Sequence, residues 1–136
     1  MRDEEGLLFE DLTEKIIDAF FEVYNFFEYG HLESVYQRAL VVALCERGLR
    51  CESEVLFPLT FHGINVGNYR ADLVVEGTII VESKTVPLVN SAHQAQVYNY
   101  LRCSRLLVGL LLNFGPKSSF MRFLNPIVLR RPPPAD

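Results

Sequence analysis

The sequence lacks a stretch of apolar residues long enough to cross a membrane. Its longest aliphatic stretch, which follows Arg105, is interrupted at Gly109, whereas a membrane-spanning helix needs about 20 apolar residues. The chain begins MRDEE, which is acidic where a secretory signal has a basic region and an apolar core. These absences predict a soluble protein with no membrane partner and a cytoplasmic location.

Cysteine is scarce. Cys45, Cys51 and Cys103 form an odd set without a CxxC pair and without a histidine at zinc-finger spacing. A zinc site or a disulfide framework is therefore not expected. We interpret the three cysteines as small, buried apolar side chains.

Positive charge is not in excess, since 13 Lys and Arg residues stand against 17 Asp and Glu, for a formal net charge of -4. This balance argues against a protein that coats nucleic acid by bulk electrostatics, but it allows an acidic metal pocket that acts on a phosphate. With 49% apolar and 22% charged residues, the chain can form one core. We expect a single domain over residues 11–128, between a flexible N-terminus (1–10) and a flexible, proline-rich tail (129–136).

The spacing of apolar residues predicts an α/β fold. Helical spacing predicts three helices, over residues 11–29, 31–47 and 91–103. Alternation with a period of two, or a continuous apolar run, predicts five strands, over residues 51–61, 66–74, 78–84, 106–112 and 120–124. An Asp11-x-x-Glu14 capping box opens the first helix, and Pro58 favours an edge position or a bulge for the first strand. The β-α-β step around the third helix implies a parallel pair in a mixed sheet flanked by helices.

The segment RADLVVEGTIIVESK sets charged residues into apolar strands: Asp72, Glu82 and Lys84. A three-residue hairpin loop at residues 75–77 would place Arg70 opposite Glu82 and Glu82 diagonal to Asp72. Asp72, Glu82 and Lys84 would then share one face of the sheet. A two-residue turn at the Glu-Gly pair would instead put the two carboxylates on opposite faces.

Two converging carboxylates repel each other unless a cation or a proton lies between them. Such hard oxygen ligands suit Mg²⁺ or Mn²⁺, with open positions for water and a substrate phosphate. Lys84 beside the site could help to activate the water or offset charge on the phosphate. The structural alternative is that Glu82 pairs with Arg70 while Lys84 lies extended at a strand end.

Other polar side chains are spaced to reach the same pocket. By the three-and-four spacing rule the second helix has three on one side: Glu33, Tyr36 and Gln37. The third helix has a polar stripe of His93, Gln96 and Tyr100. Taken alone, each of these polar residues is also typical of an ordinary helix start or of a half-exposed helix surface.

Together these residues resemble the PD-(D/E)XK nuclease superfamily, with Asp72 on one strand and Glu82-Ser83-Lys84 on the next. Gln96-x-x-x-Tyr100 is similar to the Q-x-x-x-Y signature of the RecB-like branch, and Gly30-x-x-Glu33-x-x-Tyr36 to the pattern that names the GxxExxY proteins. The resemblance covers about residues 11–124. It implies a restriction-endonuclease-like αβββαβ core with an extra N-terminal helix.

The resemblance also implies roles for single residues. Asp72 and Glu82 would bind Mg²⁺ or Mn²⁺ together with the backbone carbonyl of Ser83, with Glu33 as an auxiliary ligand. Lys84 would assist the nucleophile and Gln96 would orient the site. Four further residues are expected to line it: Tyr36, Arg70, His93 and Tyr100.

These features predict a metal-dependent nuclease that cuts DNA or RNA. Six basic residues are candidate phosphate contacts: Arg38, Arg70, Arg102, Arg105, Lys117 and Arg122. The alternative is a nuclease-fold module with little turnover that acts in nucleic-acid binding or protein assembly, as a homodimer or beside a partner nuclease. A hydrolase built on Ser or Cys has no nucleophile elbow in this sequence to support it.

Overall fold

The computed structural model describes residues 9–129, so the flexible ends expected at residues 1–10 and 129–136 lie almost wholly outside the described residues. The described part contains the expected order of two helices, three strands, a helix and further strands, and it adds a short C-terminal helix, α4 (Pro126–Leu129). No helix among residues 9–129 is both long and apolar enough to cross a membrane.

The first helix, α1 (Glu10–Phe27), buries the predicted apolar stripe, including Ile16, Phe20 and Val23. The predicted capping box is wrong. Phe9 is the N-cap residue and makes no side-chain capping hydrogen bond, while Asp11 already lies inside the first helical turn. There its carboxylate still interacts favourably with the positive end of the helix dipole.

The loop between the first two helices is longer than expected. α1 ends before Gly30, because Glu28 takes a positive φ of 59°. Gly30 itself has a φ of 124°, which favours glycine. The second helix, α2 (Glu33–Glu46), therefore begins at Glu33 and not at His31.

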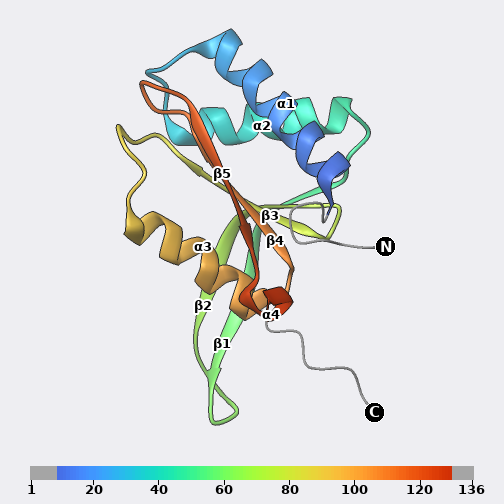
Figure 1. Ribbon diagram of the computed structural model, residues 1–136, viewed down its shortest axis with the longest axis vertical. Helices are drawn as coiled ribbons and strands as arrows, with labels where there is room; N and C mark the ends of the chain where they lie inside the picture. The colour runs from blue at the N-terminus through green and yellow to red at the C-terminus, as the bar shows by residue number, and fades with distance from the viewer. Residues whose placement is uncertain (1–8, 130–136) are drawn as a thin grey trace.

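Five strands form one mixed sheet in the order β1-β2-β3-β4-β5 (Figure 1). Their bounds are β1 (Cys51–Phe61), β2 (Ile64–Val75), β3 (Ile79–Lys84), β4 (Val108–Asn113) and β5 (Ser119–Leu124). The strands β3 and β4 pair in parallel, and the helix α3 (Ser91–Ser104) connects them. The other neighbours pair antiparallel. The predicted parallel pair with a helical crossover is thus confirmed.

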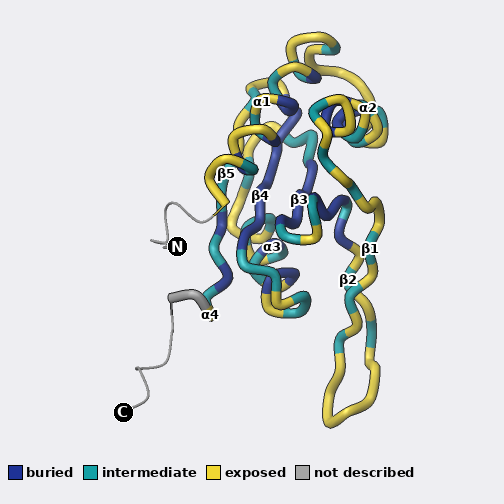
Figure 2. Tube along the Cα trace, turned by 90° about the vertical axis from the view of Figure 1, so that its right-hand side faces the viewer, coloured by how far each residue is buried: buried dark blue, intermediate teal, exposed yellow. Residues whose placement is uncertain are grey.

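Helices cover both faces of the sheet. One buried cluster joins α1 and α2 to sheet residues such as Val81 and Leu110, and a second joins α3 to Ile80 and Leu111. All residues of β4 are buried, as the continuous apolar run predicts, and Figure 2 shows β3 and β4 inside the molecule. The approach of α3 is close, because a Cβ at Gly109 would lie 2.8 Å from Val97 Cγ1.

The β1–β2 hairpin forms a long arm at the edge of the sheet. β1 is the edge strand, as Pro58 suggests, and the pairing of β1 with β2 shifts between Leu59 and Thr60. The far end of the hairpin extends away from the helices and is largely exposed (Figure 2).

The expectation of three buried cysteines is wrong in part. Cys45 is exposed, because it lies on the outer side of the last turn of α2, and Cys51 and Cys103 are half-buried. All three are free thiols. Burial, with a further contribution from neighbouring Cys45, raises the pKa of Cys51 to about 11, so this thiol stays protonated at neutral pH.

Candidate active site

The loop between β2 and β3 has three residues, as expected, but it lies one residue later in the chain. Val75 pairs with Ile79, so the loop consists of Glu76, Gly77 and Thr78. Glu76 and Gly77 take positive φ values of 53° and 64°, and the Thr78 N–H donates to the Val75 carbonyl at 3.0 Å. The tight turn is therefore centred on the Glu76-Gly77 pair. Thr78 is the third residue of the loop, which is closed by the pairing of Val75 with Ile79.

This register decides which residues face each other. Leu73 pairs with Val81, and one further step puts Asp72 directly opposite Glu82, where the sequence predicted a diagonal arrangement. The expectation that Arg70 lies opposite Glu82 is wrong. Arg70 pairs with Leu56 of β1 instead.

Arg70 therefore does not touch the acidic pair. Its guanidinium lies 3.4 Å from the Glu54 carboxylate, and the Arg70 side chain is 63% exposed. The structural alternative, in which Glu82 is neutralised by Arg70, is thereby excluded.

The two acids are held by hydrogen bonds that cross between the strands. The Asp72 N–H donates to Glu82 Oε2 at 3.0 Å. The Ser83 N–H donates to Asp72 Oδ2 at 2.9 Å. Each carboxylate thus accepts a main-chain N–H of the opposite strand, which fixes its position relative to the other acid.

The regular alternation of β2 breaks at Asp72. Leu73 packs in the core cluster of α1 and α2, whereas Ala71, two residues earlier, packs in the cluster of α3. Residues two apart on a regular strand share a face, so the strand turns over at Asp72. Glu54 lies at the corresponding place in β1, and it has a positive φ of 54°. Asp72 therefore lies where the alternation of β2 is irregular. A prediction based on strict alternation with a period of two does not include this irregularity.

Burial and like charge make Glu82 hard to ionise. The residue is 2% exposed. Burial, followed by the charge of Asp72, raises the pKa of Glu82 to about 8, while the Asp72 N–H and Lys84 act against this shift. Burial also raises the pKa of Asp72, opposed by the Ser83 N–H and then by Lys84. At neutral pH the pair therefore retains a proton on Glu82 unless a cation takes its place.

Glu33 and Lys84 belong to the same electrostatic neighbourhood. Glu33 is the first residue of α2 and is half-buried. Burial and then the charge of Asp72 raise the pKa of Glu33, and Lys84 lowers it. Lys84 thus acts on all three acids, Glu33, Asp72 and Glu82.

The third helix brings Gln96 and Tyr100 to the acids. Burial, with the charges of Glu82 and then Asp72, raises the pKa of Tyr100 to about 12. Gln96 Nε2 donates to the Tyr100 hydroxyl at 3.3 Å. These two residues of the predicted polar stripe therefore lie beside the site, with Gln96 joined to it through Tyr100.

Tyr36 does not line the site. It is fully buried, its ring stacks on Phe114 at 4.6 Å, and its hydroxyl donates to the Glu28 carbonyl and accepts the His31 N–H. The helical spacing that groups Tyr36 with Glu33 is correct, but this side of α2 turns into the core. Tyr36 closes the loop that leads to Glu33.

His93 is a helix cap. Its Nδ1 accepts the Asn90 N–H at 3.1 Å, and its own N–H donates to Asn90 Oδ1 at 3.0 Å. These reciprocal bonds form a capping box at the start of α3. The structure thus gives His93 a capping role, and the expectation that it lines the site stays a prediction.

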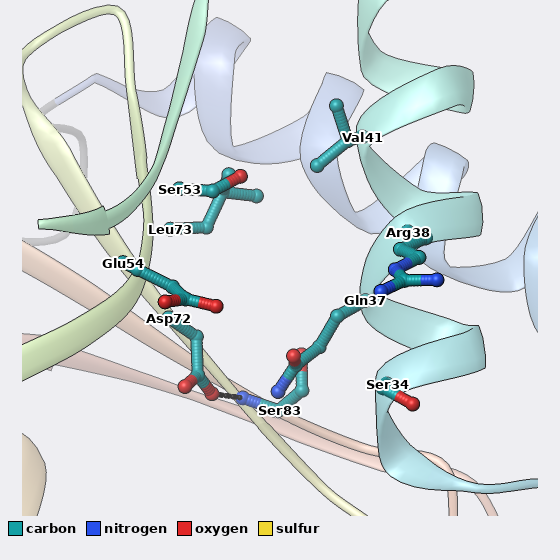
Figure 3. Close-up of a pocket in the computed structure, with 9 residues that line it drawn as sticks. All are labelled: Ser34, Gln37, Arg38, Val41, Ser53, Glu54, Asp72, Leu73 and Ser83. Carbon is teal, nitrogen blue, oxygen red and sulfur yellow. Dashed lines mark hydrogen bonds between the residues drawn. The ribbon is translucent and has the colours of Figure 1, made fainter.

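A pocket of about 170 Å³ opens beside Asp72 between α2 and the strands (Figure 3). Its lining includes three polar residues of α2, of which the second and third follow the first at helical spacing: Ser34, Gln37 and Arg38. Figure 3 shows Gln37 directed from α2 toward the floor of the pocket, where Asp72 meets Ser83. Of the six candidate phosphate contacts, Arg38 is the one that lines this pocket.

Sequence reasoning missed Ser34 and Glu54 in this lining. Ser34 follows Glu33 directly, and the helical spacing from Ser34 to Gln37 and Arg38 was a usable signal. Glu54 reaches the pocket because β1 pairs with β2 in this particular register, which the sequence does not reveal.

The residues fit a divalent cation, although not through three acidic ligands. Within residues 9–129 no group of three or more His, Cys, Asp or Glu side chains is placed to hold a metal, so Glu33 is near Asp72 but is not gathered with it and Glu82 into one ligand set. Asp72 and Glu82 supply hard oxygen atoms, and the Ser83 main chain contacts Asp72 through its N–H. A cation between the two carboxylates would replace the proton that burial forces onto Glu82.

Residues 10–123 match the family described as the PD-(D/E)XK nuclease superfamily. The chain belongs to this superfamily. Its five-stranded mixed sheet flanked by helices agrees with the restriction-endonuclease-like fold, and the membership supports a nuclease function. Nucleases of this superfamily generally use divalent metal ions.

Two solved structures show the same fold. The protein designated SSO0001 has a TM-score of 0.53 and 23% identity over 68% of this chain and 50% of its own. An alkaline exonuclease, LHK-Exo, from Laribacter hongkongensis has a TM-score of 0.53 and 14% identity over 71% of this chain and 57% of its own. This superfamily chain thus spans about half the length of each protein. No curated protein matches the sequence.

Proposed function

We propose that this protein is a metal-dependent nuclease that hydrolyses phosphodiester bonds of DNA or RNA with Mg²⁺ or Mn²⁺. The observation that carries the proposal is the pair of opposed acids. Asp72 and Glu82 are each fixed by a main-chain N–H of the other strand, and burial with like charge raises the pKa of Glu82 to about 8. A fold has no need for two acids at such a place, but a cation site does.

A divalent ion held by Asp72, Glu82 and the Ser83 carbonyl would polarise the scissile phosphate and lower the pKa of the attacking water. The ammonium of Lys84, which already acts on both acids, would offset negative charge that develops on the phosphate. Gln96 would orient the site through its hydrogen bond to Tyr100. Glu33 would act as an auxiliary acid at the start of α2, with Arg38 on the pocket wall as a phosphate contact.

Within the superfamily we assign the chain to the GxxExxY proteins. Each of the three residues that define the Gly30-x-x-Glu33-x-x-Tyr36 motif has a structural or electrostatic role that supports this assignment. Gly30 supplies a positive φ of 124°, Glu33 lies within the electrostatic reach of Asp72, and buried Tyr36 ties the loop to the core.

Cellular location and assembly are part of the same proposal. The three free thiols suit a reducing compartment, which supports a cytoplasmic location. The outer edge of β1, which pairs with no other strand within residues 9–129, offers a surface for the homodimer. Analytical ultracentrifugation tests this assembly.

The decisive experiment compares wild-type protein with Glu82→Gln. Gln keeps an oxygen for the Asp72 N–H but removes the charge. Single-stranded and duplex DNA and RNA are incubated with Mg²⁺, with Mn²⁺ and with EDTA. We expect cleavage by the wild type with metal, none in EDTA, and none by Glu82→Gln. The control is Glu52→Gln, an exposed acid on β1. Equal cleavage by Glu82→Gln and wild type would refute the proposal.

One observation favours the alternative, a module that binds nucleic acid or a partner with little turnover. The described residues hold no group of three or more acidic, His or Cys side chains placed for a metal, so the site rests on two carboxylates. Isothermal titration calorimetry separates the two hypotheses. Heat of Mg²⁺ or Mn²⁺ binding at neutral pH that disappears in Glu82→Gln supports the nuclease, and its absence in the wild type supports the module.

A further inference from the structure

Positive charge gathers around the C-terminal end of α3. A surface hollow of about 450 Å³ lies between this end and the β1–β2 hairpin, lined by Tyr69, Asn99, Arg102 and Arg105 among others. A second hollow, of about 290 Å³, lies between α3 and α4 and shares both arginines. A third, of about 390 Å³, contains Arg102 and Arg122. We call these three spaces the Arg102 hollows.

The Arg102 hollows contrast with the rest of the chain. None of the three has an acidic residue in its lining, although the protein carries a formal net charge of -4. Arg102 and Arg105 are exposed, and within residues 9–129 neither lies within ion-pair distance of a carboxylate. Arg102 donates to Asn99 Oδ1 at 3.0 Å with one nitrogen, which orients its guanidinium and leaves further N–H groups available.

A chain of side-chain contacts joins the first hollow to the active site. Gln96, Tyr100 and Cys103 lie on one stripe of α3 by their spacing. In the middle of this stripe Tyr100 lies beside the two acids. At its C-terminal end Cys103 Sγ lies 3.1 Å from the Pro58 carbonyl of the hairpin. Tyr69 packs edge-on against Tyr100, with 5.0 Å between ring centroids, and itself lines the hollow.

The lining matches the chemistry of a nucleic-acid strand. Guanidinium groups bind phosphate oxygens, and their planar fork suits two oxygens at once. Aromatic rings beside a positive groove are the usual platform for unpaired bases, and Tyr69 and Tyr98 line the first and third hollows. The hollows thus offer positive charge for the phosphodiester backbone and aromatic rings for the bases.

We propose that the Arg102 hollows bind the phosphate backbone of a single strand of nucleic acid that leaves the active site past Tyr100 and Tyr69. The inference rests on the proposed function, since it takes this strand to be the substrate. Arg102 and Arg105 are the phosphate contacts. They line hollows bounded by the hairpin, α3 and α4, so the hairpin arm supplies one wall of the first hollow. Figure 1 shows the hairpin arm and α4 next to α3.

The test measures binding in EDTA, where no metal-dependent cleavage occurs. Labelled single strands of DNA and of RNA, each of about 20 nucleotides, are titrated by fluorescence anisotropy over a range of salt concentrations. The variant is Arg102→Gln with Arg105→Gln. The matched control, called the lysine control after Lys15, is Lys15→Gln with Arg50→Gln, which removes the same charge from two other exposed positions. Arg102→Lys with Arg105→Lys keeps the charge.

For two phosphate contacts we expect the arginine variant to bind about tenfold more weakly near physiological salt, with the salt slope reduced by about 1.4. The lysine control should bind like wild type, and the Arg-to-Lys variant should keep the wild-type salt slope. A preference for the DNA or the RNA probe then identifies which strand the hollows accept. Unchanged unfolding temperatures would show that the variants fold.

The inference is overturned if wild-type protein binds neither probe, if the arginine variant binds like wild type, or if the lysine control loses as much affinity as the arginine variant. Cleavage with Mg²⁺, measured on the same proteins, keeps the two proposals apart. Arginine-dependent binding without cleavage refutes the nuclease and leaves the strand path. Cleavage that does not depend on Arg102 and Arg105 refutes the path alone.

Discussion

The raised pKa of Glu82 predicts a specific pH dependence of stability. In the unfolded chain the carboxyl has its ordinary pKa of 4.5, and in the folded protein its pKa is about 8. Below pH 4.5 both states are protonated and the folded state keeps its full stability. Between these two values the folded state holds a proton that the unfolded state has lost, so the free energy of unfolding decreases as pH rises.

The size of the effect follows from the same two values. Each pH unit inside the window costs about 1.4 kcal/mol. From about pH 5.8 to 7.8, with the curve flattening near the folded pKa, the loss amounts to about 2 kcal/mol. Urea unfolding followed by circular dichroism in EDTA at both pH values measures it. The comparison is wild type against Glu82→Gln, which does not titrate.

We expect the wild type to lose about 2 kcal/mol more than Glu82→Gln between the two pH values. Glu52→Gln controls for the loss of one negative charge and should follow the wild type. Excess Mg²⁺ should restore stability most at the higher pH, where the carboxyl is ready to lose its proton. Parallel pH profiles for wild type and Glu82→Gln would refute the reasoning, because Glu82 would then ionise in the fold without cost.

Three further substitutions test separate parts of the structure. Lys84→Met should lower kcat by about 100-fold or more without lowering Mg²⁺ affinity, since the lost charge is positive; steady-state kinetics and calorimetry measure the two effects. Gly109→Ala should cost about 1–3 kcal/mol in urea unfolding, because its methyl group would lie 2.8 Å from Val97 Cγ1, whereas Gly67→Ala, with its nearest neighbour at 4.0 Å, should be tolerated. His93→Ala should cost about 1 kcal/mol of stability through the lost cap and leave the cleavage rate unchanged; lost cleavage at full stability would assign the imidazole to the site.

The elements of the fold could be predicted because the local signals are strong. The alternation of β1, the continuous apolar run of β4 and the stripe of α1 each appear at the expected place. Their ends could not be read in the same way. The ends of α1 depend on positive φ values at Phe9 and Glu28, two residue types that give no warning of that conformation.

The candidate site could be predicted in part for a similar reason. A loop of three residues was expected and is present, so an error of one residue in its position still left the two acids in contact across neighbouring strands. The predicted partner of Glu82 across the strands was wrong, because Arg70 pairs with β1 and reaches Glu54 instead. The reversal of facing at Asp72 depends on the path of β1 as well, and a sequence read strand by strand does not contain that information.

The hydrogen bonds between the two acids and the main chain show which property of these side chains the fold requires and which it does not. Both N–H groups require an acceptor, and a neutral amide at either position would supply one. Neutral side chains would also spare the molecule the repulsion that now falls on Glu82. A descendant that had given up hydrolysis could therefore keep this architecture with Asn and Gln in both places and gain stability in doing so. Negative charge at these two positions thus destabilises the folded protein and is not required by the fold.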